Sequence, residues 1–307
     1  MSQYLLLRAL AKAGGVLPAR VLFAAADILG TLAWYLVPRL RAVTLDHMRH
    51  VLGPHASMRD CAQAARGCVR SAARYYVDLV RGPHLPPGSG FDAVACVDGL
   101  DRLFTAIERG CGVIVVSAHL GNPESMARAF GHIGIDLMVL TEPLHPPRVH
   151  ALVHALRATP GARFVPADLR GVRAAIEHLR GGGVLAVMAD RDVLGSGQPV
   201  AFFGERARLP AGPVELALRT GATVLPAFVL RAPGERLRIV FEPPLALPRG
   251  VPHSAPQSAP QSAPQSGNRA AKVAAGHRLL AAALERGIVR APDQWFPLDP
   301  IWSGLAH

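Results

Sequence analysis

The sequence has few of the residues that would indicate nucleic-acid binding, a metal centre or a disulfide framework. Only 6% of its 307 residues are aromatic, and no nucleic-acid-binding motif accompanies them, so we expect no nucleic-acid partner. The four cysteines, at positions 61, 68, 96 and 111, show neither zinc spacing nor a disulfide framework, which predicts reduced, mostly buried thiols in a cytosolic protein. No His-Glu-x-x-His motif is present, and we therefore expect no metal.

Acidic residues and lysine are also scarce. The chain has 33 Lys and Arg against 22 Asp and Glu, a net charge of +11, and its only lysines are Lys12 and Lys272. Half of the residues are nevertheless hydrophobic, and the mean hydropathy is +0.24. This combination favours anionic lipid head groups as partners, although a GC-rich genome would produce part of the same Arg, Ala, Gly and Pro bias.

A long, uninterrupted hydrophobic run is missing from the N-terminal region. Residues 16–37 are largely apolar, but Pro18, Arg20 and Asp27 interrupt them, and the cleanest stretch, 21–37, is at the short limit for a spanning helix. No convincing small-residue cleavage site precedes Arg39. We predict an apolar helix that packs on the domain or dips into the membrane surface, with a membrane anchor or a cleaved signal as alternatives.

The pattern of hydrophobic residues predicts an α/β fold. Residues 1–90 read as a helical N-terminal region, membrane-associated or packed on the core, and residues 91–307 as a single α/β domain with a mainly parallel central sheet flanked by helices. The predicted strands are Val113–Ala118, Leu137–Thr141, Val184–Ala189, Val224–Val229 and Leu237–Phe241. The predicted helices are 58–80, Leu100–Arg109, Pro123–Ile133, Val149–Ala158, Leu169–Arg180, Ala211–Thr220 and 270–286.

Two low-complexity segments are assigned to connections. Gly181-Gly-Gly183 follows a predicted helix and precedes a strand, the reverse of a phosphate-binding loop, so we expect a helix C-terminal turn. The Ser-Ala-Pro-Gln repeat at 254–266 carries no charge, and we expect a disordered or polyproline-like insert there.

The segment His119-Leu-Gly-Asn-Pro-Glu124 is the most informative in the chain. It follows the apolar run 112–118, which places His119 at the carboxyl end of a buried strand, where open α/β sheets bind ligands. Asn122 suits the N-cap and Pro123 the first position of the next helix. A tight turn can bring Glu124 back to the imidazole, and such a pair can take a proton from a hydroxyl. His-x4-Glu is a short pattern, and by spacing alone a helix cap with a satisfied surface His–Glu pair is the simpler interpretation.

Four segments together resemble the bacterial lipid A late acyltransferase superfamily, and within it the actinobacterial phosphatidylinositol mannoside acyltransferases. Leu45-Asp-His-Met-Arg-His-Val-Leu52 resembles an early helix of the family, and 117–124 its His-x4-Asp/Glu block. The second block is matched by Met188-Ala-Asp-Arg-Asp192 with 202–205 and 209–213, and the C-terminal signature by Pro292-Asp-Gln-Trp295. Pro123 and the Ser-Ala-Pro-Gln insert depart from the family pattern.

The resemblance implies an acyltransferase that moves a fatty acyl chain from acyl-CoA to a hydroxyl of a phosphatidylinositol mannoside or related glycolipid, without a resident cofactor. It implies His119 as general base with Glu124 orienting it. The resemblance also implies a set of residues that bind substrate, support the base or stabilise the tetrahedral intermediate: Glu142, Arg157, Asp190, Arg191 and Asp192. For Glu142 and Arg157, an ion pair that only supports the cleft is an open alternative. The absence of a Gly-x-Ser-x-Gly elbow agrees with direct attack rather than an acyl-enzyme.

Three other functions stay open at this point. A lipid A acyltransferase that uses acyl carrier protein shares the same segments. A hydrolase would use the same base to activate water, and a non-catalytic lipid-binding protein would keep only the fold. The expected location is the cytoplasmic face of the bacterial inner membrane, peripheral or N-terminally anchored, within cell-envelope lipid biosynthesis. The sequence leaves acyl-chain length, the acceptor hydroxyl and the oligomeric state undetermined.

Overall fold

The computed structural model describes residues 2–86, 92–248 and 265–302. Most of the Ser-Ala-Pro-Gln tract, residues 254–264, lies outside the described residues. Its last two residues, Gln265 and Ser266, form the start of the last long helix instead of belonging to the insert.

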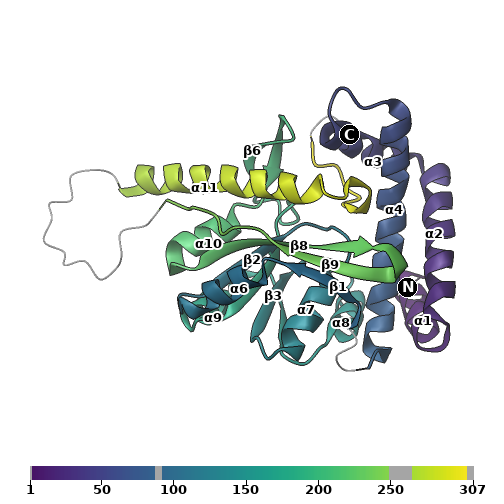
Figure 1. Cartoon of the computed structure of the whole chain (residues 1–307), viewed down its shortest axis with the longest axis horizontal. Coiled ribbons are helices and arrows are strands. Elements are labelled where there is room, and N and C mark those ends of the chain that lie inside the picture. The colour runs from purple at the N-terminus through teal and green to yellow at the C-terminus, as the bar shows by residue number, and fades with distance from the viewer. Residues whose placement is uncertain (1, 87–91, 249–264, 303–307) are drawn as a thin grey trace, which may run out of the picture.

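A seven-stranded sheet forms the centre of the protein (Figure 1), in the order β1-β9-β8-β2-β5-β3-β4. Five of its neighbouring strand pairs are parallel and the β8–β9 pair is antiparallel, which confirms the predicted mainly parallel sheet. A separate antiparallel hairpin is formed by β6 and β7. The strands are β1 (Val94–Asp98), β2 (Val113–Ser117), β3 (Leu137–Thr141), β4 (Ala162–Pro166), β5 (Val184–Met188), β6 (Gln198–Phe202), β7 (Glu205–Leu209), β8 (Thr223–Ala232) and β9 (Arg236–Phe241).

Helices cover both faces of the sheet and one of its ends (Figure 1). The α-helices are α1 (Ser2–Val16), α2 (Ala19–Leu36), α3 (Pro38–Leu52), α4 (Met58–Arg81), α6 (Leu100–Glu108), α7 (Pro123–His132), α8 (Pro147–Arg157), α9 (Leu169–Arg180), α10 (Gly212–Thr220) and α11 (Gln265–Ile288). Short 3-10 turns are η1 (Gly82–His84), η2 (Pro233–Glu235) and η3 (Pro292–Gln294).

Strand β2 shows why the central strands are apolar throughout. Its residues alternate between two hydrophobic clusters: Val113 and Val115 pack with side chains of α6 and α7, and Ile114 and Val116 with those of α9, α10 and α11. A strand covered on both faces buries every side chain, which gives a continuous apolar run in place of alternation.

The N-terminal helices differ from the single apolar helix that the sequence predicts. The helix breaks before Pro18, because proline lacks the N–H group that a helix interior requires, and it continues as α2. Helix α2 lies on the outer side of α4 (Figure 1), with Phe23, Ala26 and Trp34 buried against it. Gly30 allows the close approach, since a Cβ there would lie 2.9 Å from Cα of Arg70.

The predicted strands and helices of the core are confirmed to within a few residues, as is the turn at Gly181–Gly183, where the Gly183 N–H bonds to the His178 carbonyl. Strands β1 and β4 were missed. Both lie at the edges of the sheet, where mixed polar and apolar residues give little periodic signal. The sequence also gave no indication of the β6–β7 hairpin.

Candidate active site

His119 lies where the sequence predicts, two residues beyond the end of β2. Strand β5 pairs with β2 in parallel, with Ser117 opposite Met188, and the N–H of Ala189 continues the pairing by donating to the Ser117 carbonyl over 2.9 Å. This register brings the residues that follow the two strands together at one edge of the sheet. His119 and Asp190 are therefore neighbours because of strand pairing, although they are far apart in the sequence.

Asp190 holds His119 through two hydrogen bonds. Its Oδ1 atom lies 2.8 Å from Nδ1 of His119, and its Oδ2 atom accepts from the His119 backbone N–H over 3.0 Å. Oδ2 also accepts from the indole Nε1–H of Trp295 over 2.9 Å. The Asp190 side chain is fully buried, while 25% of the His119 side chain remains exposed. The imidazole is thus fixed from behind and reachable from outside.

These contacts keep Asp190 ionised. Burial alone would favour the neutral acid, but attraction and hydrogen bonds from His119 and Trp295 outweigh it and lower the pKa of Asp190 below its usual value. An ionised Asp190 can only accept a hydrogen bond, so Nδ1 of His119 carries the proton and donates it to Oδ1. The lone pair of the neutral imidazole is therefore on Nε2. In this arrangement Nε2 of His119 can accept a proton, and the Asp190 carboxylate can stabilise the resulting imidazolium.

The C-terminal segment completes the turn that carries His119. The N–H of Phe296 donates to the His119 carbonyl over 2.9 Å, and the N–H of Gly121 donates to the Gln294 carbonyl over 3.1 Å. Gly121 has φ +64, and a Cβ there would lie 2.0 Å from the Val229 carbonyl oxygen, so only glycine fits. Pro292–Trp295, which the sequence identifies only as a family signature, thus holds the turn that carries His119.

The prediction that Glu124 contacts His119 is wrong. Both residues are described, and no hydrogen bond joins them. Asn122 caps α7 as predicted, accepting from the Ser125 N–H over 3.3 Å, and this directs Glu124 into the first turn of the helix. Its Oε1 atom instead accepts from Nε of Arg157 over 2.8 Å and from the hydroxyl of Tyr75 over 2.7 Å.

Glu124, Arg157 and Tyr75 form a closed cluster. Arg157 NH2 donates to the Tyr75 hydroxyl oxygen over 2.7 Å, so each residue bonds to the other two. Burial opposes charge on Arg157, but Glu124 and Tyr75 more than offset it and raise the pKa of the guanidinium. Desolvation raises the pKa of the Tyr75 hydroxyl, which therefore remains protonated. The cluster joins α4, α7 and α8 beside the His119 turn.

Glu142 and Arg157 do not form the ion pair with each other that the sequence allowed. Arg157 pairs with Glu124, whereas Glu142 pairs with Arg191. Arg191 also pairs with Asp299 over 2.9 Å, and its buried Nε atom has no hydrogen-bond partner among the described residues. Arg191 therefore ties the ends of β3 and β5 to the C-terminal segment.

Asp192 lies apart from the His119–Asp190 pair in its contacts. Its carboxylate is 3.9 Å from Nε of Arg208 on β7 and packs near Gly197. The structure thus brings Asp190 to the base, Arg191 to Glu142, and Asp192 to the hairpin. The three consecutive residues that the sequence grouped together have three different surroundings.

Sequence reasoning missed three residues of this region. Tyr75 and Asp299 carry no local signal, because only the fold brings α4 and the C-terminal segment to the strand ends. Trp295 was assigned to packing, and it is indeed fully buried, but its indole N–H also bonds to Asp190. An indole N–H that becomes buried needs an acceptor, and this was the available signal.

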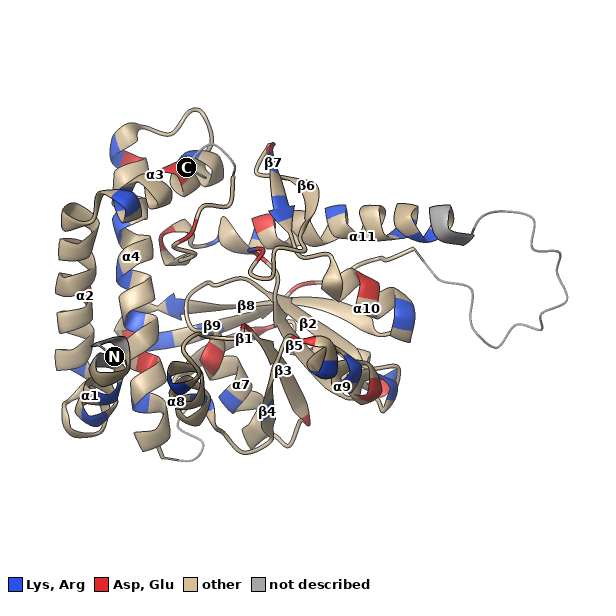
Figure 2. Ribbon diagram, turned by 180° about the vertical axis from the view of Figure 1, so that it is seen from behind, with Lys and Arg blue, Asp and Glu red and all other residues tan. Residues whose placement is uncertain are grey.

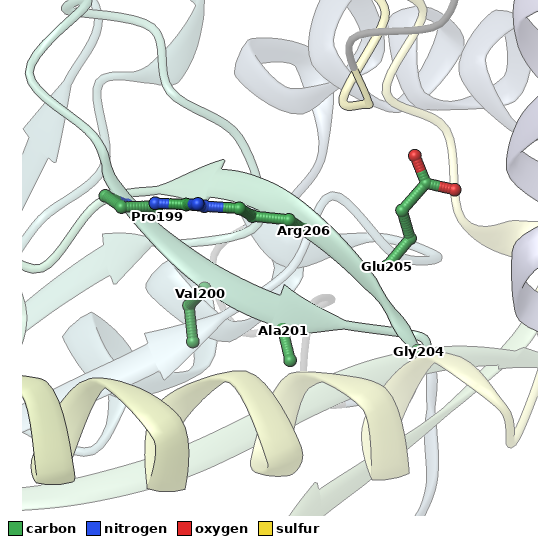
Figure 3. Close-up of a pocket in the computed structure, with 6 residues that line it drawn as sticks. All are labelled: Pro199, Val200, Ala201, Gly204, Glu205 and Arg206. Atoms are coloured by element: carbon green, nitrogen blue, oxygen red, sulfur yellow. The ribbon is translucent and has the colours of Figure 1, made fainter.

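Two further observations concern places where a metal ion or another ligand could bind. Within residues 2–86, 92–248 and 265–302, no group of three or more His, Cys, Asp or Glu side chains is placed to hold a metal ion. A shallow hollow of about 430 Å³ lies on the β6–β7 hairpin, lined by Pro199, Val200, Ala201, Gly204, Glu205 and Arg206 (Figure 3). None of the residues around His119 belongs to this hollow.

The protein is an α/β protein in which the ends of two parallel strands place an imidazole against a buried carboxylate. Such a pair is typical of enzymes that remove a proton from a hydroxyl group. The chain belongs to the bacterial lipid A biosynthesis acyltransferase family, whose sequence pattern matches residues 3–303. The match confirms the resemblance drawn from the four sequence segments.

The chain is also similar to two proteins that share one name. The chain is 30% identical over 187 residues to a phosphatidylinositol mannoside acyltransferase of Mycobacterium tuberculosis, an alignment that covers 59% of this chain and 58% of the relative. It is 29% identical over 168 residues to a protein of the same name from Mycolicibacterium smegmatis, covering 52% and 54%. The matched part is thus less than two thirds of either relative.

Proposed function

We propose that this protein transfers a fatty acyl group from acyl-CoA to a hydroxyl of a phosphatidylinositol mannoside or a related glycolipid. The observation that carries the proposal is the His119–Asp190 pair at the strand ends of a chain that belongs to an acyltransferase family. The names of the two relatives support the mannoside acceptor over lipid A.

The chemistry follows from the geometry of His119. Nε2 accepts the proton of the acceptor hydroxyl, and the acceptor oxygen attacks the thioester carbonyl carbon to form a tetrahedral intermediate. Asp190 stabilises the imidazolium during this step. The C–S bond then breaks, the ester carbonyl re-forms, and the imidazolium returns its proton to the departing thiolate. No acyl-enzyme is needed.

The neighbouring polar residues are assigned supporting roles. Nε and NH2 of Arg157 donate to Glu124 and Tyr75, so its positive charge is fixed in place, and we assign it to stabilising negative charge on the intermediate. Glu142 and Arg191 are assigned to positioning the acceptor beside the base. Asp192, which contacts the hairpin, is the residue for which the structure offers the least support as an acceptor ligand.

We also propose that the protein lies on the cytoplasmic face of the inner membrane through α2. By length and composition alone, α2 is the one helix among the described residues that could cross a bilayer, with a mean hydropathy of 1.4. Asp27 in its middle forms an ion pair with Arg74 of α4 at 2.6 Å. Spanning would separate this pair and place a carboxylate in the hydrocarbon, which favours a helix lying in the interface.

A product assay tests the proposed reaction. Purified protein is supplied with acyl-CoA, alone and with a mannosylated phosphoinositide, and lipids are identified by mass spectrometry. We expect thioester consumption to rise strongly with the acceptor, and the acceptor to gain one acyl group. Parallel reactions with acyl carrier protein thioesters and a lipid A precursor test the alternative substrates. Free fatty acid as the main product with every acceptor would show that the protein is a hydrolase.

A further inference from the structure

A small hollow lies between α2 and α4, separate from the catalytic residues. It encloses about 220 Å³ and is lined by Thr31, Gln63, Arg66 and Arg70. Thr31 comes from α2 and the other three from α4. The volume suits a phosphate group with its ester linkages and is too small for a whole sugar-bearing lipid, because drug-sized pockets begin at about 300 Å³.

The hollow belongs to a row of arginines on one side of α4. These residues recur at intervals of four or seven positions and so share one face of the helix: Arg59, Arg66, Arg70, Arg74 and Arg81. Figure 2 shows basic residues along α4 beside α2. Carboxylates balance only part of this charge, since Asp27 pairs with Arg70 and Arg74, and Glu235 pairs with Arg74.

Arg66 is the arginine of the hollow whose charge is not balanced. One of its terminal nitrogens, NH1, donates to the Tyr35 hydroxyl over 3.0 Å, and its guanidinium lies 5.8 Å from the centre of the Trp34 ring. Within the described part of the chain no carboxylate lies within ion-pair distance of it. These two contacts hold the guanidinium at the hollow and leave N–H donors free for an anion, for which a planar fork is well suited.

The hollow opens beside the apolar outer face of α2. The exposed residues of this face recur at helical spacing: Val21, Ala24, Ala25, Ile28, Leu29, Leu32, Tyr35 and Leu36. Ile28 and Leu29 are each more than 60% exposed, and the one exposed charged residue of α2 is Arg20, one turn before Ala24. An apolar helix face flanked by arginines is the arrangement by which helices lie in the interface of an anionic membrane.

We propose that the hollow between α2 and α4 binds the phosphodiester of an anionic phospholipid while the outer face of α2 lies among the acyl chains. The donors are Arg66 and the Nη1 group of Arg70, which has no hydrogen bond within the described part of the chain, and Gln63 and Thr31 line the same space. The inference rests on the proposed attachment through α2 and adds a defined head-group site to it. Asp27 does not oppose the anion strongly, since Arg70 and Arg74 neutralise it.

Vesicle co-sedimentation with the full chain tests the head-group chemistry. Three vesicles are compared: phosphatidylcholine alone, phosphatidylcholine with phosphatidylglycerol, and phosphatidylcholine with the same mole fraction of oleate. All three contain the zwitterionic phosphodiester of phosphatidylcholine, and oleate adds negative charge without adding an anionic phospholipid. We expect phosphatidylglycerol vesicles to bind more tightly than oleate vesicles. Equal binding to these two vesicles would overturn the phosphate site while leaving attachment through α2 standing.

Two arginine variants separate a defined site from diffuse attraction. Arg66→Lys keeps the charge but loses the planar fork, and should weaken binding to phosphatidylglycerol vesicles by about fivefold, the equivalent of about 1 kcal/mol. Arg59→Gln removes a charge from the same row about 10 Å along α4 from Arg66, roughly one Debye length away, and should weaken binding less than Arg66→Lys does. The reverse order of effects would mean that only overall charge matters, and the hollow would not be a site.

A second pair of variants, both at Gln63, guards against loss of folding. Gln63 is exposed and has no hydrogen bond among the described residues, so Gln63→Glu and Gln63→Lys break no hydrogen bond of the folded protein. The glutamate should weaken binding by about fivefold and the lysine should not weaken it. Equal binding by both variants would overturn the proposal. A wild-type protein that bound no vesicle would overturn attachment as well, whereas acyl transfer to detergent-dispersed acceptor reports separately on the chemistry.

Discussion

Replacing Asp190 by asparagine is the most direct test of the proposed base, because it keeps the shape and removes one charge. Asp190 accepts three hydrogen bonds, one on Oδ1 and two on Oδ2. Asparagine has one acceptor oxygen and one NH2 group. With the oxygen in the Oδ2 position, it keeps the bonds from the His119 backbone and Trp295, and its NH2 group faces Nδ1 of His119.

This orientation of the amide keeps two of the three hydrogen bonds, whereas the flipped orientation keeps only the one from Nδ1. We therefore expect the first orientation. Nδ1 must then accept a hydrogen bond, which moves the ring proton to Nε2 and removes the lone pair that takes the acceptor proton. The same substitution also removes the charge that stabilises the imidazolium. We therefore expect kcat for acyl transfer to fall by about 10³- to 10⁴-fold, as in triads where the orienting aspartate is replaced by asparagine.

The assay is acceptor-dependent release of CoA thiol, measured for wild type, Asp190→Asn and the control Asp136→Asn. Asp136 has a 68% exposed side chain and precedes β3, at the other end of that strand from Glu142. The control should keep wild-type turnover. Circular dichroism and thermal melting establish that Asp190→Asn is folded. A folded Asp190→Asn protein within tenfold of wild-type kcat would refute the assignment of His119 and Asp190 as the base pair.

Two further predictions concern stability. Tyr75→Phe removes the hydroxyl that bonds to both Glu124 and Arg157. It should lower the free energy of unfolding, measured by urea titration, by about 1–3 kcal/mol. A loss of stability no larger than that caused by Tyr76→Phe, at the exposed neighbouring residue, would contradict this prediction. Burial lowers the pKa of His47 to about 4 in the folded state, so below pH 6.5 the unfolded chain binds the extra proton and stability falls as the pH drops toward 4, by about 3 kcal/mol. His47→Phe should remove that part of the pH dependence, and unchanged urea midpoints between pH 7 and 4 in wild type would refute it.

The sequence was most informative where one residue type satisfies a local requirement. The apolar run before His119 predicted β2, and Asn122 with Pro123 predicted the start of α7, because strand burial and helix capping depend on neighbouring residues alone. The same local reasoning located His119 at a strand end. The break at Pro18 was not foreseen, although the proline that causes it was recognised as an interruption of the apolar segment.

The pairing of charged residues was much less predictable. Proximity in the sequence suggested Glu124 as the partner of His119, whereas parallel strand pairing gives that position to Asp190. Glu124 turns instead to Arg157 and Tyr75, which lie on other helices. Such contacts depend on strand order and on the angles between helices, and neither quantity is encoded in the spacing of the motif residues.

The dependence of the His119 turn on Trp295 and Phe296 has a consequence for biosynthesis. A chain emerges from the ribosome with its N-terminus first, so the apolar face of α2 is available long before the indole that bonds to Asp190 is synthesised. The proposed association with lipid through α2 therefore does not depend on the hydrogen bonds that Trp295 donates to Asp190 and Phe296 donates to His119. Those bonds can form only after the C-terminal segment has been synthesised.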